Sequence, residues 1–162
     1  MPGIWNSRLL LTEGADINGA DEEGSTALHC ASNGKVNIIN ALLDAGADVN
    51  IQGDEGATIH QAAWFGSLDT VKLLLKRGAD VNVVRKGDGH TALSEAVARG
   101  KGDVVKTLLE ASFEFSVRTL SHALTYASGG QQGDIGAMEA MLLEKVKIIS
   151  AEVDMCASKG VN

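Results

Sequence analysis

The sequence predicts an all-α solenoid, in which helix-turn-helix units stack side by side and project β-turn loops from one edge. Two short motifs support this prediction, because a Gly-Ala-Asp-Val-Asn pentapeptide (with Ile for Val in one copy) and a Gly-x-Thr tripeptide each occur three times. The pentapeptide occupies residues 14–18, 46–50 and 78–82, and the tripeptide occupies residues 24–26, 56–58 and 89–91. Successive copies lie 32 or 33 residues apart. Such a constant period is typical of stacked arrays, since one short unit cannot bury its apolar face alone.

The composition indicates a folded chain in a reducing compartment. The 162 residues are 44% hydrophobic, which argues against disorder, and only 4% aromatic, so Leu, Val, Ile and Ala must build the core. No apolar run approaches the roughly 20 residues of a membrane span, and the N-terminus lacks a signal-peptide pattern. The two cysteines do not make a disulfide framework. We therefore expect a cytoplasmic or nuclear location and no membrane partner.

The charge of the chain is acidic and uneven. The formal net charge is −7, and residues 1–60 hold nine acidic and two basic side chains, whereas residues 61–110 hold six and eight. An acidic chain without a long basic stripe argues against nucleic acid and anionic lipid as partners. The asymmetry predicts a protein or peptide partner with a basic patch. The alternative is that the acidic surface serves only solubility.

Residues 21–50 illustrate the first helix of the predicted unit. Thr26 suits a helix N-cap, because its hydroxyl can accept a hydrogen bond from a backbone N–H of the first turn. A short helix is predicted at 27–33. Leu28 and Ala31 lie three residues apart, so both should face inward.

The second helix and its loop follow in the same unit. Gly34 ends the first helix, where a left-handed backbone is needed. Apolar residues at helical spacing predict the second helix at 36–43, and Gly46 ends it. Asp48 and Asn50 then have the side chains that hydrogen-bond nearby backbone groups in loops.

This unit resembles the ankyrin repeat, whose pattern is Gly-x-Thr-Pro-Leu-His-x-Ala-Ala, a Gly, an apolar second helix and Gly-Ala-Asp-Val-Asn. The match is specific in residues 19–50 and continues through residues 51–110. The resemblance implies a non-enzymatic interaction module, which presents a rigid concave surface of loop tips and first helices to a protein or peptide.

The histidine of the ankyrin pattern is not kept in every unit. His29 stands in that position, but His60 and Gln61 stand where Leu and His are expected, and Ser94 replaces the third His. The hydrogen bonding that this His provides in the family is therefore expected only at His29.

The ends of the array are less regular than its middle. The predicted units are a partial repeat at 1–18, repeats at 19–50, 51–82 and 83–115, a degenerate repeat at 116–150 and a partial repeat at 151–162. The chain is thus either a piece of a longer array or one whose half-repeats act as caps.

No metal site is expected from the histidines. His29, His60, His90 and His122 fall in different units. Stacked helices lie roughly 8–10 Å apart, whereas zinc needs all its ligand atoms about 2 Å from one centre.

No catalytic or cofactor site is expected either. The Gly-rich segment at 129–136 lacks the Gly-Lys-Ser/Thr ending of a phosphate loop, and a flexible insertion explains it better. Cys30 and Cys156 share one position of the unit beside an inward Ala and are expected to be small buried fillers. An enzyme with an unrecognised site around 111–136 remains a rival interpretation.

Trp64 and Phe65 are the leading candidates for partner contact. They end the first helix of their unit, at positions that vary in ankyrin-like proteins and face the concave groove. Large aromatic side chains often dominate binding energy at such places. The alternative is that one ring packs on the neighbouring repeat.

The loop tips form a second candidate surface. Glu22, Glu23, Asp54 and Glu55 align as an acidic row, after which Arg85, Lys86 and Asp88 mix the sign of the charge. Isolated surface charges contribute little, but aligned ones can steer a partner and set its register. His90 and Arg99 complete the predicted binding set.

The rival interpretation is a structural role, in which the chain is a self-associating fragment of a longer array. An array that stops within a repeat can expose apolar edges, here around residues 9–11 or 155–156, and uncapped solenoid ends tend to associate.

Overall fold

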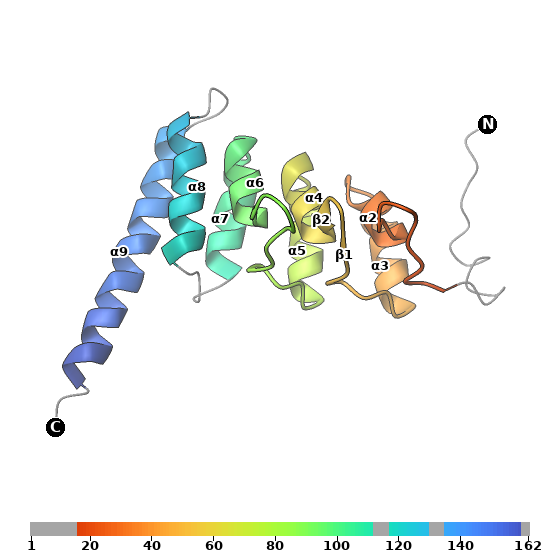
Figure 1. The fold of residues 1–162 in the computed structure, drawn as a ribbon, viewed down its shortest axis with the longest axis horizontal. Helices are drawn as coiled ribbons and strands as arrows, with labels where there is room; N and C mark the ends of the chain where they lie inside the picture. The colour runs from red at the N-terminus through yellow and green to blue at the C-terminus, as the bar shows by residue number, and fades with distance from the viewer. Residues whose placement is uncertain (1–15, 112–116, 130–134, 160–162) are drawn as a thin grey trace.

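Two rows of antiparallel helices form the protein, and the computed structural model describes residues 16–111, 117–129 and 135–159 (Figure 1). The helices are α2 (Ala27–Ala31), α3 (Val36–Asp44), α4 (Thr58–Phe65), α5 (Leu68–Lys76), α6 (Ala92–Ala98), α7 (Gly102–Ala111), α8 (Val117–Gly129) and α9 (Ile135–Lys159). Helices α2, α4, α6 and α8 pack in one row, and α3, α5, α7 and α9 pack in the other. The predicted all-α solenoid is confirmed.

The buried core runs along the interface between the two rows. Each pair contributes fully buried side chains, beginning with Leu28 and Ile39 and continuing through the later pairs. Further members are Ile59, Leu74, Leu93, Leu108, Leu120 and Leu142. The inward positions predicted for Leu28 and Ala31 are confirmed, since both are buried. Burying a side chain of this size contributes about 1.5–3 kcal/mol to the free energy of unfolding. Because a unit buries these side chains against its neighbours, the stability of the array depends on contacts between neighbouring pairs.

The projecting loops pack directly on one another. Strands β1 (Gln52–Gly53) and β2 (Gly56–Ala57) form a small antiparallel hairpin between α3 and α4. The N–H of Asp54 donates to the carbonyl of Glu23 at 2.9 Å, which joins this hairpin to the preceding loop. A Cβ on Gly24 would lie 2.9 Å from the Cα of Gly53, and Gly24 also has φ of +72°. Glycine is therefore required at this contact.

Helices α2, α4 and α6 each begin with a buried polar side chain that accepts a backbone hydrogen bond. The N–H of Thr26 donates to Nδ1 of His29 at 3.1 Å. Thr26 is the N-cap of α2, as predicted, but its hydroxyl pairs with Nδ1 of His29 at 2.9 Å and not with a backbone N–H of the first turn. The N–H of Ala57 donates to Nδ1 of His60 in the same way, also at 3.1 Å. Ser94 takes this role in α6, where its Oγ accepts from a backbone N–H at 2.9 Å.

The prediction that this bonding occurs only at His29 is therefore wrong. The N-cap of α4 is Ala57, which directly follows the loop glycine Gly56, whereas Ser25 separates the corresponding pair in the preceding unit. The shorter loop shifts the helix start by one residue. His60 therefore occupies the third helical position, as His29 does in α2.

Asparagine side chains also tie successive loops together. The backbone N–H of Asp48 donates to Oδ1 of Asn18 at 2.8 Å, and that of Asp80 donates to Oδ1 of Asn50 at 2.9 Å. The predicted local bond is present too, since the N–H of Asn50 donates to Oδ1 of Asp48. These residues thus link neighbouring units as well as ordering their own loops.

The C-terminal end departs from the predicted unit pattern. Helix α9 runs without a break from Ile135 to Lys159, so the boundary predicted between 150 and 151 falls inside a helix. Residues 1–15 and 130–134, which include the predicted apolar edge at 9–11 and most of the Gly-rich segment, lie outside the described residues. The other unit boundaries stay predictions. Among the described helices, none is both long and apolar enough to cross a membrane.

Replacing Asn50 by Ala should lower the free energy of unfolding by about 1–2 kcal/mol, because the N–H of Asp80 loses its acceptor and the carbonyl of Gly78 loses a donor. Urea unfolding followed by circular dichroism measures the change. Asn37→Ala is the matched control, since Asn37 is exposed on α3, and it should change stability by less than about 0.5 kcal/mol. Equal effects of the two substitutions would contradict the proposed ladder.

Candidate protein-binding groove

A groove pocket of about 370 Å³ opens between the loop edge and the row of first helices. Side chains from α2, α4 and α6, the β1–β2 hairpin and the loop before α6 line it. Its lining includes Glu55, His60, Trp64, Phe65, Arg85 and Glu95. The pocket thus joins three consecutive units, so a ligand in it would contact all three.

Trp64 and Phe65 form the apolar wall of this pocket. They end α4 just before Gly66, whose φ of +75° turns the chain toward α5. Trp64 is 41% exposed and Phe65 is 52% exposed. The guanidinium carbon of Arg99 lies 3.1 Å from the centre of a Trp64 ring, as in a cation–π contact. Three of the predicted binding residues are therefore together on one surface.

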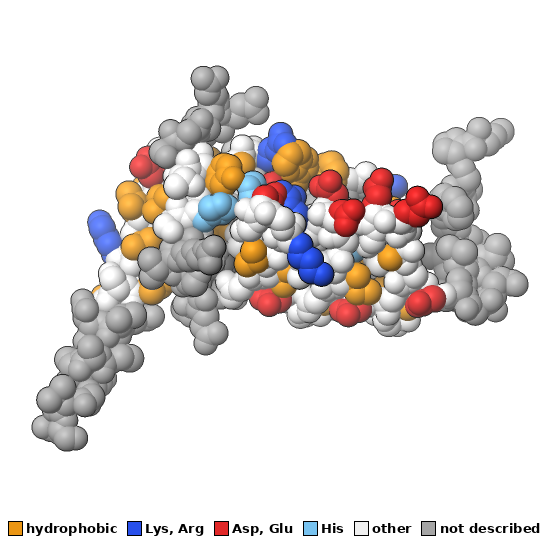
Figure 2. Space-filling view, in the orientation of Figure 1, with side chains coloured by type: hydrophobic (Ala, Val, Ile, Leu, Met, Phe, Trp, Pro, Cys, Tyr) orange, Lys and Arg blue, Asp and Glu red, His pale blue; other side chains and the backbone are white. Residues whose placement is uncertain are grey.

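The predicted acidic row lies on the exposed loop edge beside the pocket. Glu22, Glu23, Asp54 and Glu55 are all exposed. Figure 2 shows acidic side chains gathered along the edge of the molecule over α2 and the hairpin. Glu55 lies 3.9 Å from Arg85, and no other ion pair of this row occurs within the described part of the chain. Most of this negative charge therefore faces solvent.

Arg85 does not project from its loop like the acidic row. Its side chain is only 15% exposed, and its guanidinium lies 2.9 Å from Oε1 of Glu95 and also bonds Asp88. The hydrogen bond from Arg85 holds the pKa of Asp88 well below its usual range. The mixed charge predicted at this tip is thus largely neutralised within the protein.

Glu95 is a buried carboxylate that was not singled out from the sequence. It is 1% exposed, and its Oε1 accepts from Arg85 and from Nδ1 of His90, the latter at 3.0 Å. Its Oε2 is buried and has no hydrogen-bond partner. The sequence does offer a signal for a buried carboxylate here, because Glu95 is the one charged residue of α6 and lies among small and apolar residues.

The side chain of His90 makes most of its contacts within the protein. Its Nδ1–H donates to Glu95, so its Nε2 accepts from the hydroxyl of Tyr126 at 2.6 Å. The ring also contacts those of Tyr126 and His122 edge to face, with centroids 4.9 Å and 5.5 Å away. This cluster fastens the loop before α6 to α8. Contact of His90 with a partner stays a prediction.

The expectation of a buried Cys30 is wrong. Cys30 is exposed and lines the pocket together with His29. Its side chain is therefore on the groove side of α2 and does not fill the core between α2 and α3. The side chain of Cys156 lies outside the described part of α9. Among the side chains that the structure describes, no cluster of His, Cys, Asp and Glu is suited to a metal ion.

The comparisons with known proteins agree with the arrangement of the helices. The family model described as ankyrin repeats (3 copies) matches residues 5–53 and 59–151, which is most of the chain. No curated protein matches it.

Mild acid should destabilise the protein through His29 and His60. Burial lowers the pKa of both below 6.5, so the unfolded chain binds more protons as the pH falls through that value. The neutral imidazoles of His29 and His60 contribute fully to stability above the pKa that histidine has in the unfolded chain, and this contribution is lost as the pH falls below it. The urea midpoint should therefore be lower at pH of about 5.5 than at about 7.5.

A His29→Gln/His60→Gln variant is the control, because its amides cannot titrate in this window. Its midpoint should change less between the two pH values than that of the wild type. A wild-type midpoint that stays constant or rises on acidification would contradict the assignment.

Proposed function

Because this chain belongs to the ankyrin repeat family, whose repeats are generally protein–protein interaction modules, we propose that it binds a protein or peptide partner in the groove pocket. The observation that carries the proposal is the exposure of Trp64 and Phe65 beside each other at that pocket. Neighbouring exposed rings at a concave surface supply the apolar area on which binding hot spots depend.

The firm connection between loops also favours binding. The hairpin is bonded to the preceding loop through Glu23, and Asn50 bonds the next loop. A surface held in place before binding loses little conformational entropy when a partner arrives. The proposed activity is recognition without catalysis, by a surface formed in advance.

The acidic row would act with the pocket. Glu22, Glu23 and Asp54 lie on the same edge as Glu55, which lines the pocket itself. Their aligned charge would attract a partner with a basic patch and fix its orientation along the loops.

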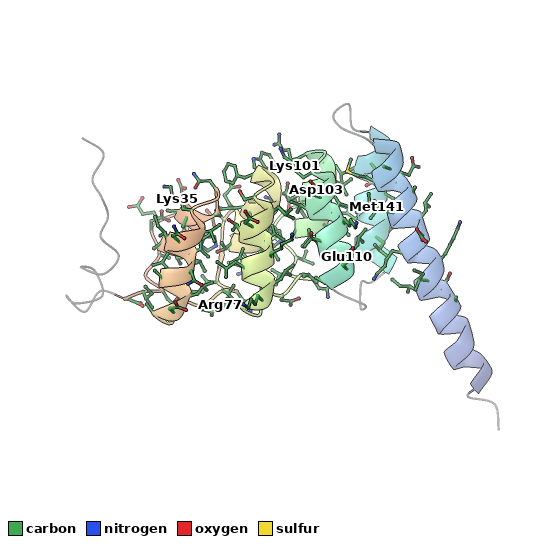
Figure 3. All side chains as sticks on the ribbon, turned by 180° about the vertical axis from the view of Figure 1, so that it is seen from behind. Lys35, Arg77, Lys101, Asp103, Glu110 and Met141 are labelled. Atoms are coloured by element: carbon green, nitrogen blue, oxygen red, sulfur yellow. The ribbon has the colours of Figure 1, made fainter. Side chains whose placement is uncertain are left out.

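Self-association is a second candidate, favoured by apolar surface near α9. A hollow of about 380 Å³ between α7 and α9 is lined by Leu109, Met141 and Ile148, with the charged Lys106, Glu110, Glu144 and Lys145 around them. Ile148 is 48% exposed. In the view from behind, Glu110 and Met141 project from these two helices (Figure 3). Sedimentation velocity over a range of concentrations tests this candidate, and a constant monomer mass would reject it.

A Trp64→Ala/Phe65→Ala variant should stay folded and lose binding to protein or peptide ligands by at least about tenfold, since exposed rings contribute more to a complex than to the core. Ligands selected on the wild type from a phage-displayed peptide library, measured by isothermal titration calorimetry, provide the test. Ile38→Ala, which removes an exposed apolar side chain from the other row, should bind as the wild type does. Equal binding by all three proteins would place the ligand site elsewhere.

A further inference from the structure

We infer that the groove pocket receives one basic side chain, lysine or arginine, of a peptide partner, and that Glu95 is the acceptor at its base. This inference rests on the proposed function and specifies the chemistry of the partner. It follows from three features of the pocket: an unused acceptor, an excess of negative charge and an apolar wall.

The unused acceptor is Oε2 of Glu95. The side chain lines the pocket, yet it is 1% exposed and Oε2 has no hydrogen-bond partner, whereas Oε1 accepts from both Arg85 and His90. A buried carboxylate oxygen without a donor is costly, because it has lost its water and gained nothing in return. An ammonium or guanidinium group entering the pocket would supply the missing donor.

The charge of the pocket also favours a cation. Among the described residues that line it, Arg85 is the one Lys or Arg, and Glu55 and Glu95 are the carboxylates. The guanidinium of Arg85 is shared with Asp88, which accepts from its Nε and Nη2. Even with Arg99 counted beside Trp64, the three carboxylates of Glu55, Asp88 and Glu95 exceed the two guanidinium groups of Arg85 and Arg99.

The apolar wall suits the stem of a long basic side chain. Trp64 and Phe65 are exposed where the pocket opens, and the methylene chain of Lys or Arg packs well on such surfaces while its charged end reaches a polar group. Arg99 already lies over Trp64, so the incoming stem would pack on Phe65 and on the part of Trp64 that stays exposed.

Other side chains fit these features less well. An apolar side chain would cover Glu95 and leave its Oε2 without a donor, and an acidic one would be repelled by Glu55 and Glu95. The predicted order of preference is therefore Lys or Arg, then an uncharged side chain of the same length, then Asp or Glu.

The test begins with peptides selected from a random phage-displayed library on the wild-type protein. The selected sequences should share a Lys or Arg at one position. In a synthetic copy of the best peptide, norleucine replaces that residue and keeps the stem without the charge. Isothermal titration calorimetry should show affinity weakened by about tenfold or more, because Glu95 is again left unpaired.

Glu95→Gln tests the same contact from the protein side. In this variant the preference for the basic peptide over the norleucine peptide should shrink to about twofold or less, since the carboxylate charge is gone. Its binding of the norleucine peptide reports that it is folded. Glu110→Gln, on the other row of helices, is the matched control and should keep the full preference (Figure 3). If Glu95→Gln does not fold, the norleucine comparison on the wild type still decides.

The outcomes separate this inference from the proposed function. Peptides that need Trp64 and Phe65 but carry no basic residue, or tolerate norleucine, would overturn the inference and leave the groove as the binding surface. Peptides that bind the Trp64→Ala/Phe65→Ala variant as well as the wild type would overturn both. A library that yields no binder would also contradict both.

Discussion

The structure depends on buried side chains that bond the backbone of two successive units at once. In α2, Nδ1 of His29 accepts from the N-cap N–H, so the proton is on Nε2, which donates to the carbonyl of Gly56 in the next loop at 3.0 Å. His60 repeats the arrangement, with Nε2 donating to the carbonyl of Val83 at 3.1 Å. Each imidazole therefore starts its own helix and holds the following loop. Because these groups are buried, leaving either one unpaired would be costly, and the loops are held at a set distance from the helices.

That constraint also shapes the groove pocket. The loop held by His29 carries Glu55, and the loop held by His60 carries Arg85, so the charged lining is positioned by the same bonds that stack the units. The aromatic wall comes from the end of α4, within the same unit as His60. Fold and groove are thus two consequences of one bonding scheme, and a change at either His should affect both.

The sequence was sufficient for the fold because its signals are local and repeated. Glycines at constant spacing and apolar residues at helical spacing predicted the stacked helices. The position of Trp64 in the unit, compared with the ankyrin pattern, predicted that its side chain is exposed at the groove. The one-residue shift of the helix start at His60 could not be predicted, because the sequence Gly56-Ala57-Thr58 resembles Gly24-Ser25-Thr26. Only the hydrogen bond to His60 identifies Ala57 as the N-cap. The link from Glu95 through His90 to Tyr126 joins residues of different helices, which repeat spacing alone does not reveal.

A partner is proposed to occupy the groove side of the array. The occupancy of this side is tested most directly by adding a selected peptide to ¹⁵N-labelled protein and following amide and indole resonances. We expect large shifts for the Trp64 indole N–H and for amides of α4, α6 and the hairpin, with little change in α3 and α5. Shifts concentrated in α3, α5 or the hollow between α7 and α9, with an unmoved Trp64 indole, would contradict it.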